Sequence, residues 1–114
     1  MKKRDYSDYL QDILDSCSDV QEFIKGLSYD DFACDKKTKA ATVRAIEVIG
    51  EAVKNIPASF RAKHTNIPWK QIAGMRDKLI HEYFGVDSRV LWKTATEDVP
   101  QIEAEFEKII KEID

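Results

Sequence analysis

The stretch Ala45-Ile46-Glu47-Val48-Ile49-Gly50-Glu51-Ala52-Val53 decides how this chain folds. It lies in a predicted helix from about Lys36 to Ile56, with Asp35 as the N-cap and Pro57 at its end. Its apolar side chains occupy more than one face of the helix. Such a helix either lies at the centre of a bundle or is buried again by a partner chain. Gly50 would let another helix approach it closely.

The chain before this helix predicts one long helix and one short one. Apolar residues recur at steps of four and three from Tyr6 to Leu27, which predicts a helix from about Ser7 to Lys25. Residues 28–32 have the pattern of a single helical turn, in which Ser28 can cap the free amides.

The chain after it predicts a turn-rich link over residues 57–67 and two further long helices. Pro68 suits the first turn of a helix that carries Tyr83 and ends at Gly85. A last helix begins at position 87 or 88, and Pro100 should kink it or divide it in two. No strand pattern is visible. We therefore expect an all-α fold, an antiparallel bundle of four main helices plus one or two short helices.

The composition fits one soluble, helix-rich domain over residues 1–114, with 43% hydrophobic and 34% charged residues. No apolar run approaches the roughly 20 residues that cross a bilayer, and we see no signal-peptide pattern. We expect a cytoplasmic protein without membrane contact. Cys17 and Cys34 lack metal-ligand spacing, and Cys17 falls on an apolar stripe, which favours a reduced, buried thiol.

The charge distribution is uneven. The net charge of −3 argues by itself against nucleic-acid binding, yet residues 35–81 carry 10 basic and 4 acidic groups between two acidic thirds. The local field rather than the net charge steers a polyanion toward a surface. The alternative is a chance cluster of solvated lysines, such as Lys36, Lys37 and Lys39 at a helix start. His64 is interpreted as a solvated turn residue rather than a phosphate ligand.

One octapeptide, Arg76-Asp77-Lys78-Leu79-Ile80-His81-Glu82-Tyr83, combines side chains suited to phosphodiester chemistry without a metal or cofactor. A histidine can take the proton from a ribose 2′-OH, and an arginine can hold the phosphate and stabilise its added charge. The 2′-OH would restrict such chemistry to RNA.

Helical geometry separates the two candidate catalytic residues. On an ideal helix Arg76 and His81 point about 140° apart, so a straight helix in one chain would not bring both to one substrate. Asp77 and His81 share a face, and Asp77 would orient the imidazole or favour its charged form. We expect a composite site completed by a second copy across a two-fold axis.

Two carboxylates on the central helix resemble a paired acidic site. Glu47 and Glu51 lie on one helical face, but no ligand histidine is near them in the sequence. Salt bridges to Arg44 and Lys54, or a supporting position near Arg76, are the preferred interpretations.

Two runs closely resemble the HepT-type toxins of the HEPN superfamily. They are Ile67-Pro68-Trp69-Lys70-Gln71-Ile72-Ala73-Gly74-Met75-Arg76-Asp77-Lys78-Leu79-Ile80-His81-Glu82-Tyr83-Phe84-Gly85 and Arg44-Ala45-Ile46-Glu47-Val48-Ile49-Gly50-Glu51-Ala52. The family motif Arg-x4-His-x-Tyr matches Arg76, His81 and Tyr83 without a gap, and the resemblance extends from the first helix to the last. At the position after the arginine, where the family often has Asn, this chain has Asp77.

The resemblance implies an all-helical, HEPN-like homodimer with a cleft between the protomers. It implies a metal-independent endoribonuclease, a hydrolase-type nuclease of tRNA or mRNA, with Arg76 and His81 as the catalytic pair. It also implies the toxin half of a toxin–antitoxin pair, whose antitoxin is an MntA-type nucleotidyltransferase. That partner transfers AMP from ATP to Tyr83, and the metal and ATP belong to it. The added phosphate would compete with RNA for Arg76.

Two alternatives stay open. The first is a non-catalytic module that binds nucleotides or RNA, or that scaffolds a nucleotidyltransferase; Asp77 and the negative net charge favour it. The second is a helical interaction protein in which the Arg-x4-His motif is structural.

Overall fold

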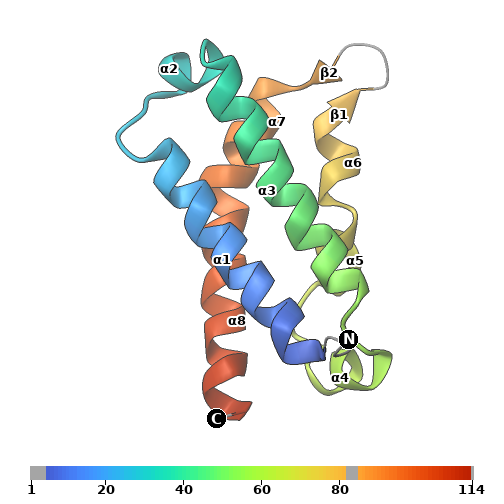
Figure 1. Ribbon diagram of the computed structural model, residues 1–114. Helices are drawn as coiled ribbons and strands as arrows, with labels where there is room; N and C mark the ends of the chain where they lie inside the picture. Colours follow the sequence, from blue (N-terminus) through green and yellow to red (C-terminus); the bar gives the residue numbers. More distant parts are fainter. Residues whose placement is uncertain (1–4, 82–84, 114) are drawn as a thin grey trace, which may run out of the picture.

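The computed structural model describes residues 5–81 and 85–113 of the chain. Its elements are α1 (Tyr6–Ile24), α2 (Tyr29–Ala33), α3 (Lys36–Lys54), α4 (Ala58–Lys63), α5 (Trp69–Ala73), α6 (Met75–Leu79), β1 (Ile80–His81), β2 (Gly85–Val86), α7 (Ser88–Lys93), the π-helical segment η1 (Thr94–Asp98) and α8 (Val99–Ile113) (Figure 1). The predicted all-α bundle is confirmed. None of the described helices combines the length and apolar character that crossing a membrane requires.

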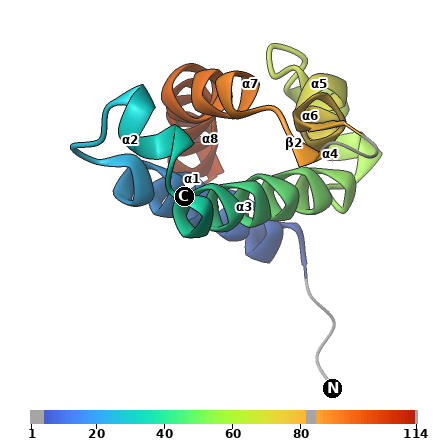
Figure 2. The same ribbon diagram turned by 90° about the horizontal axis from the view of Figure 1, so that it is seen from above.

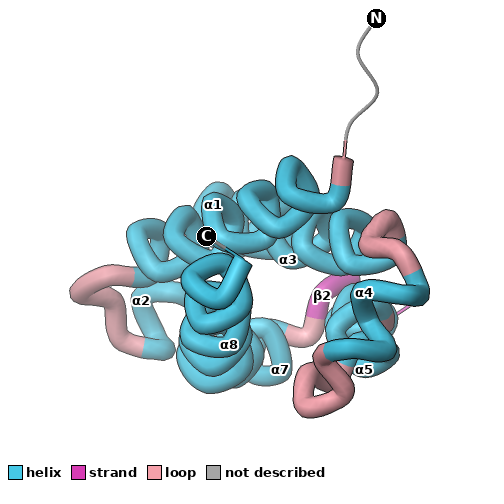
Figure 3. Tube along the Cα trace, turned by 90° about the horizontal axis from the view of Figure 1, so that it is seen from below, coloured by secondary structure: helices cyan, strands magenta, loops and turns pink. Residues whose placement is uncertain are grey.

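The helices form two layers. Figures 2 and 3 show α1 and α3 side by side in one layer, with α5–α6 and the continuous α7–η1–α8 segment packed across them. The apolar stripe predicted for the first helix faces the core between the layers, and so do apolar residues of the last helix. Their buried residues include Leu10, Ile13, Cys17 and Val20 on α1, and Phe106 and Ile109 on α8.

The central helix α3 is covered by its own chain. It packs against α1 on one side and against α2, α5, α6 and α7 on others. Its buried residues are Thr42, Ala45, Ile46, Ile49, Gly50, Ala52 and Val53. Packing within one chain therefore accounts for the apolar residues on several faces of α3, and a partner chain is not needed to explain them.

The predicted caps of the two helices before the middle of the chain are confirmed. The Asp35 carboxylate accepts a hydrogen bond from the Thr38 amide at 3.0 Å, and the Ser28 hydroxyl accepts one from the Asp31 amide at 3.1 Å. The hydrogen bond from the Thr38 amide lowers the pKa of Asp35, because it stabilises the carboxylate.

The helix predicted from Pro68 to Gly85 is wrong in its second half. It is interrupted at Gly74, and α6 ends at Leu79. Ile80 then pairs with Val86, and the Asp87 amide donates to the Leu79 carbonyl at 2.9 Å. β-branched residues favour extended backbone, and this short antiparallel pairing replaces the helical turns that were predicted there. Tyr83, which the predicted helix was expected to carry, lies outside the described residues.

The irregularity predicted at Pro100 takes the form of a π-helical segment. The Val99 amide donates to the Thr94 carbonyl, five residues back. Pro100 has no N–H and cannot make the regular bond to the carbonyl of Thr96. The helix therefore continues through η1 into α8 without a break.

The link over residues 57–67 contains the short helix α4. Phe60 anchors it, with ring centroids 4.9 Å from Tyr6, 4.6 Å from His64 and 6.4 Å from Trp69. His64 is half-buried against Phe60, so its interpretation as a solvated turn residue is corrected.

Candidate active site

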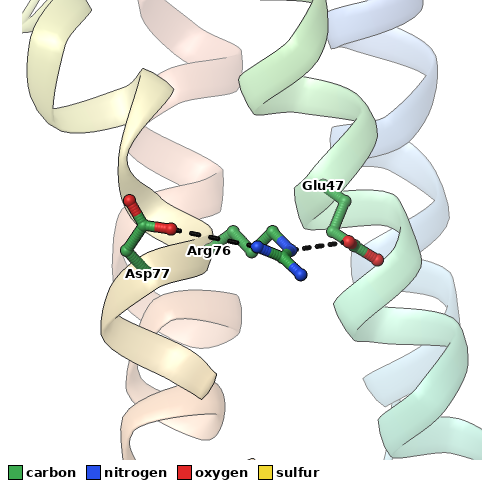
Figure 4. Close-up of polar contacts among 3 residues, drawn as sticks. All are labelled: Glu47, Arg76 and Asp77. Atoms are coloured by element: carbon green, nitrogen blue, oxygen red, sulfur yellow. Dashed lines mark hydrogen bonds and ion pairs between the residues drawn. The ribbon is translucent and has the colours of Figure 1, made fainter. Parts of the chain in front are cut away.

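The motif arginine meets a carboxylate from the central helix. Arg76 Nε donates a hydrogen bond to Glu47 Oε2 at 2.8 Å (Figure 4). The Arg76 side chain is 53% exposed and that of Glu47 is 25% exposed. The guanidinium is therefore held on its inner side by α3 and open to solvent on the other.

A close helix approach brings the two residues together. A Cβ atom on Gly50 would lie 3.2 Å from the Ala73 carbonyl oxygen, so α3 and α5 nearly touch there. The segments run antiparallel (Figure 1). Glu47 lies three residues before Gly50, and Arg76 three residues after Ala73, so the two side chains face each other one turn from the contact.

A second carboxylate lies near the outer side of the guanidinium. The distance between Arg76 Nη1 and Asp77 Oδ1 is 4.0 Å, and the Asp77 side chain is 82% exposed. Both ion pairs that the structure defines among the described residues thus contain Arg76.

These side chains surround a hollow of about 280 Å³ between α3 and α5–α6. Its lining residues are Glu47, Gly50, Glu51, Lys54, Ala73, Arg76 and Asp77. Glu47 pairs with Arg76 rather than with Arg44 as one expectation had it. Within the described residues, no ion pair joins Glu51 to Lys54. Two cationic side chains, Arg76 and Lys54, therefore line the hollow together with the carboxylates of Glu47, Glu51 and Asp77.

The second catalytic candidate follows Arg76 on a different element. His81 lies in β1, where its backbone pairs with Gly85. The expected angle of about 140° between Arg76 and His81 does not apply, because α6 ends before His81. For the same reason Asp77 and His81 do not share a helical face. The side chain of His81, and Tyr83 as a whole, lie outside the described part of the structure.

A nucleophilic role for the buried cysteine is disfavoured. Burial of Cys17, aided by the carboxylates of Glu103 and Glu107, raises the pKa of the thiol to about 12. The expected buried, reduced thiol is confirmed, whereas Cys34 is free and exposed. Over the described part of the chain, no group of three or more His, Cys, Asp or Glu residues is placed to hold a metal ion.

A second hollow, of about 240 Å³, lies on the other side of α6, and no sequence pattern predicted it. It lies between α5–α6 and η1–α8, and its lining includes Gln71, Met75, Lys78, Thr94 and Asp98. The π-helical segment forms part of its wall, and only the proline at position 100 hinted at such an irregularity.

Comparison with known proteins gives a consistent result. The family described as ribonuclease HepT-like matches residues 13–109. A probable ribonuclease HepT of Thermococcus cleftensis is 54% identical over 109 residues, which cover 96% of this chain and 99% of that protein. A putative RNase of Methanocaldococcus jannaschii is 53% identical, over 100% of this chain and 94% of that protein. A putative RNase of Caldanaerobacter subterraneus is 50% identical, over 90% and 92%. No solved structure matches the chain.

Proposed function

This chain belongs to the ribonuclease HepT-like family, and from that premise we propose that it is a metal-independent endoribonuclease and the toxin of a toxin–antitoxin pair. The names of its relatives support the ribonuclease part of this proposal. The observation that carries it is the state of Arg76, which is anchored by Glu47 and still 53% exposed. An arginine held in this way is ready for an anionic ligand.

The proposed reaction is internal transesterification of RNA. The ribose 2′-oxygen attacks the adjacent phosphorus, and the bond from phosphorus to the 5′-oxygen breaks. The products are a 2′,3′-cyclic phosphate and a free 5′-hydroxyl. His81 accepts the 2′-OH proton, and His81 or its counterpart in a second copy protonates the leaving oxygen. Arg76 binds the phosphate and stabilises the charge that develops on it.

We place this site at a cleft between two copies of the chain, as the family resemblance implies. The physical argument is exposure. In one chain Arg76 lies at an open surface, where solvent screens charge. A second copy would exclude water from the site and strengthen the interaction of Arg76 with the transition state. Glu47, Glu51 and Asp77 have supporting positions in this proposal.

The proposed regulation acts through Tyr83. An MntA-type nucleotidyltransferase would attach AMP to its hydroxyl, transferring the group from ATP and releasing pyrophosphate. Each added phosphate brings a negative charge and strong acceptor oxygens. Because Tyr83 is two residues from His81 in the sequence, the nucleotide would compete with RNA for Arg76.

RNA cleavage by the purified chain tests the enzyme directly. Labelled tRNA and mRNA are incubated with the protein in EDTA, and the products are examined for 2′,3′-cyclic phosphate ends. Arg76→Ala and His81→Ala should each lower the rate at least roughly 100-fold. Arg44→Ala is the matched control, because Arg44 is exposed on α3 outside the hollow. Full activity of both motif variants would refute the assigned chemistry.

A non-catalytic nucleic-acid module is the second candidate. The three carboxylates around the hollow favour it, since they oppose the approach of a polyanion. Binding of RNA without cleavage, under every metal condition tried, would favour this module over the enzyme.

A further inference from the structure

The two carboxylates beside Arg76 hold it with unequal strength. Glu47 is mostly buried and accepts a hydrogen bond from Nε at 2.8 Å. Asp77 is 82% exposed, and its nearest oxygen lies 4.0 Å from Nη1, beyond hydrogen-bonding distance. Figure 4 shows them on opposite sides of the guanidinium, Glu47 from α3 and Asp77 from the same helix as Arg76.

The pattern of donors on the guanidinium separates the two contacts further. Arginine has five N–H donors, one on Nε and two on each Nη. Within the described residues, the bond from Nε to Glu47 is the hydrogen bond that this guanidinium makes. The outward fork formed by Nη1 and Nη2 therefore has no hydrogen-bonded acceptor in that part of the chain. A phosphate binds arginine through such a fork, with two parallel N–H···O bonds.

The strengths of the two contacts decide which one a phosphate can replace. An exposed ion pair changes an equilibrium constant by roughly fivefold or less, and water screens it. The bond to Glu47 is short, charge-assisted and mostly buried, so it is considerably stronger. A phosphate that approaches the Nη fork thus meets Asp77, the weaker partner, and not Glu47.

We propose that Glu47 is the positioning residue of Arg76, whereas Asp77 is a displaceable counter-ion that the RNA phosphate replaces on binding. The inference rests on the proposed function, because it takes RNA as the ligand of Arg76. In the free protein Asp77 lowers the attraction of Arg76 for anions. When RNA binds, the Asp77 side chain turns into solvent and the phosphate occupies the fork. No covalent bond changes in this exchange.

The test is RNA affinity measured without cleavage. The probe is a fluorescein-labelled single strand in which every 2′-hydroxyl is methylated, so transesterification is blocked. Fluorescence anisotropy at low salt gives Kd for the chain. Asp77→Asn should tighten binding by roughly two- to fivefold. The gain should vanish when Arg76→Ala is added, because Asp77 acts through Arg76.

Glu51→Gln is the matched control for charge. It removes one negative charge from the same hollow, and among the described residues Glu51 makes no ion pair or hydrogen bond with the Arg76 guanidinium. We expect it to change the affinity less than Asp77→Asn does. Equal gains from both variants, or a gain from Asp77→Asn that persists with Arg76→Ala, would overturn the assignment to Asp77.

The positioning role of Glu47 has its own comparison. Glu47→Gln keeps an oxygen that can accept the bond from Nε, whereas Glu47→Ala removes it. We expect Glu47→Ala to bind RNA roughly fivefold more weakly than Glu47→Gln, with melting temperatures that confirm both are folded. Equal affinity of the two folded variants would overturn the positioning role.

Failure of this inference can be separated from failure of the proposed function. If natural RNA is not cleaved but Asp77→Asn still tightens binding through Arg76, the enzyme proposal fails and the exchange stands. If natural RNA is cleaved but Asp77→Asn behaves like Glu51→Gln, the exchange fails and the enzyme stands. Absence of any RNA binding by the folded protein would overturn the exchange outright.

Discussion

Gly50 of α3 and Ala73 of α5 meet backbone to backbone, since a Cβ atom on Gly50 would lie 3.2 Å from the Ala73 carbonyl oxygen. One turn further along each segment, Glu47 and Arg76 form their hydrogen bond. The spacing between the two helices therefore determines whether the carboxylate reaches the guanidinium. A side chain at position 50 would act on the candidate active site without touching it.

Gly50→Val should lower the free energy of unfolding by about 1 to 3 kcal/mol, because the added atoms press on a backbone oxygen that cannot turn away. It should also weaken RNA binding by pushing Glu47 from Arg76. Urea unfolding and the anisotropy assay measure the two effects.

The control for Gly50→Val is Ala40→Val, which introduces the same β-branched residue at an exposed position of α3. It should change both quantities little. A folded Gly50→Val protein with unchanged stability and RNA affinity would contradict the role assigned to this contact.

The raised pKa of the Cys17 thiol predicts that the folded chain loses stability at alkaline pH. Burial raises the pKa of this thiol from 9.0 to about 12 in the folded chain. Above pH 9 the unfolded chain loses this proton while the folded chain keeps it, so unfolding is favoured as pH rises. The decline should approach about 1.4 kcal/mol per pH unit above pH 9 and level off near the folded pKa.

Urea unfolding of the wild type and of Cys17→Val between pH 7 and 11 isolates this contribution from other titrating groups. The variant should lose less stability than the wild type above pH 9. If the unfolding free energies of the two proteins fall in parallel with pH, the Cys17 thiol ionises equally in the folded and unfolded chains. Under native conditions, iodoacetamide should label the exposed Cys34 and leave Cys17 unmodified.

Local chemistry made much of this fold predictable. The caps at Ser28 and Asp35 need only a hydroxyl or carboxylate three residues before an amide. The central position of α3 follows from apolar residues on several of its faces. The irregularity at Pro100 follows from a missing N–H.

The site was less predictable because it depends on contacts between distant residues. Glu47 and Arg76 are 29 residues apart, and their bond exists because two backbones approach at Gly50. The helix predicted from Pro68 was expected to continue to Gly85, whereas after Leu79 the chain changes to the pairing of Ile80 with Val86. Helix periodicity is a local pattern, and this pairing overrides it.

The Trp69 indole ties α5 to the end of α4. Its Nε1 donates to the His64 carbonyl at 2.9 Å. Trp69→Phe keeps most of the ring packing but removes this hydrogen bond, which leaves the His64 carbonyl with the Ile67 amide, 3.2 Å away, as its donor. The change should cost about 0.5 to 1.5 kcal/mol in unfolding free energy. Chemical denaturation measures the change.

Trp92→Phe is the control for the lost indole area. Trp92 packs against Phe32 with ring centroids 5.0 Å apart, and within the described residues its indole N–H has no hydrogen-bond acceptor. Trp92→Phe should lower the unfolding free energy less than Trp69→Phe does. Equal losses would assign the effect at Trp69 to packing alone.

The proposed regulation predicts that a change at Tyr83 leaves the chain toxic but prevents its partner from neutralising it. Tyr83→Phe removes the hydroxyl oxygen, the one atom of this side chain to which AMP could be attached. It leaves Arg76 and His81 unchanged. Cells that express this variant together with the cognate nucleotidyltransferase should stop growing, whereas the wild-type pair should grow. Intact-mass measurement should show added AMP on the wild-type chain and none on the variant.

The double variant Tyr83→Phe, His81→Ala is the control. It should restore growth, because the growth arrest requires catalysis and not merely an unmodified chain. Growth of cells with the single variant and its partner, together with a wild-type chain that gains no mass, would reject regulation at Tyr83.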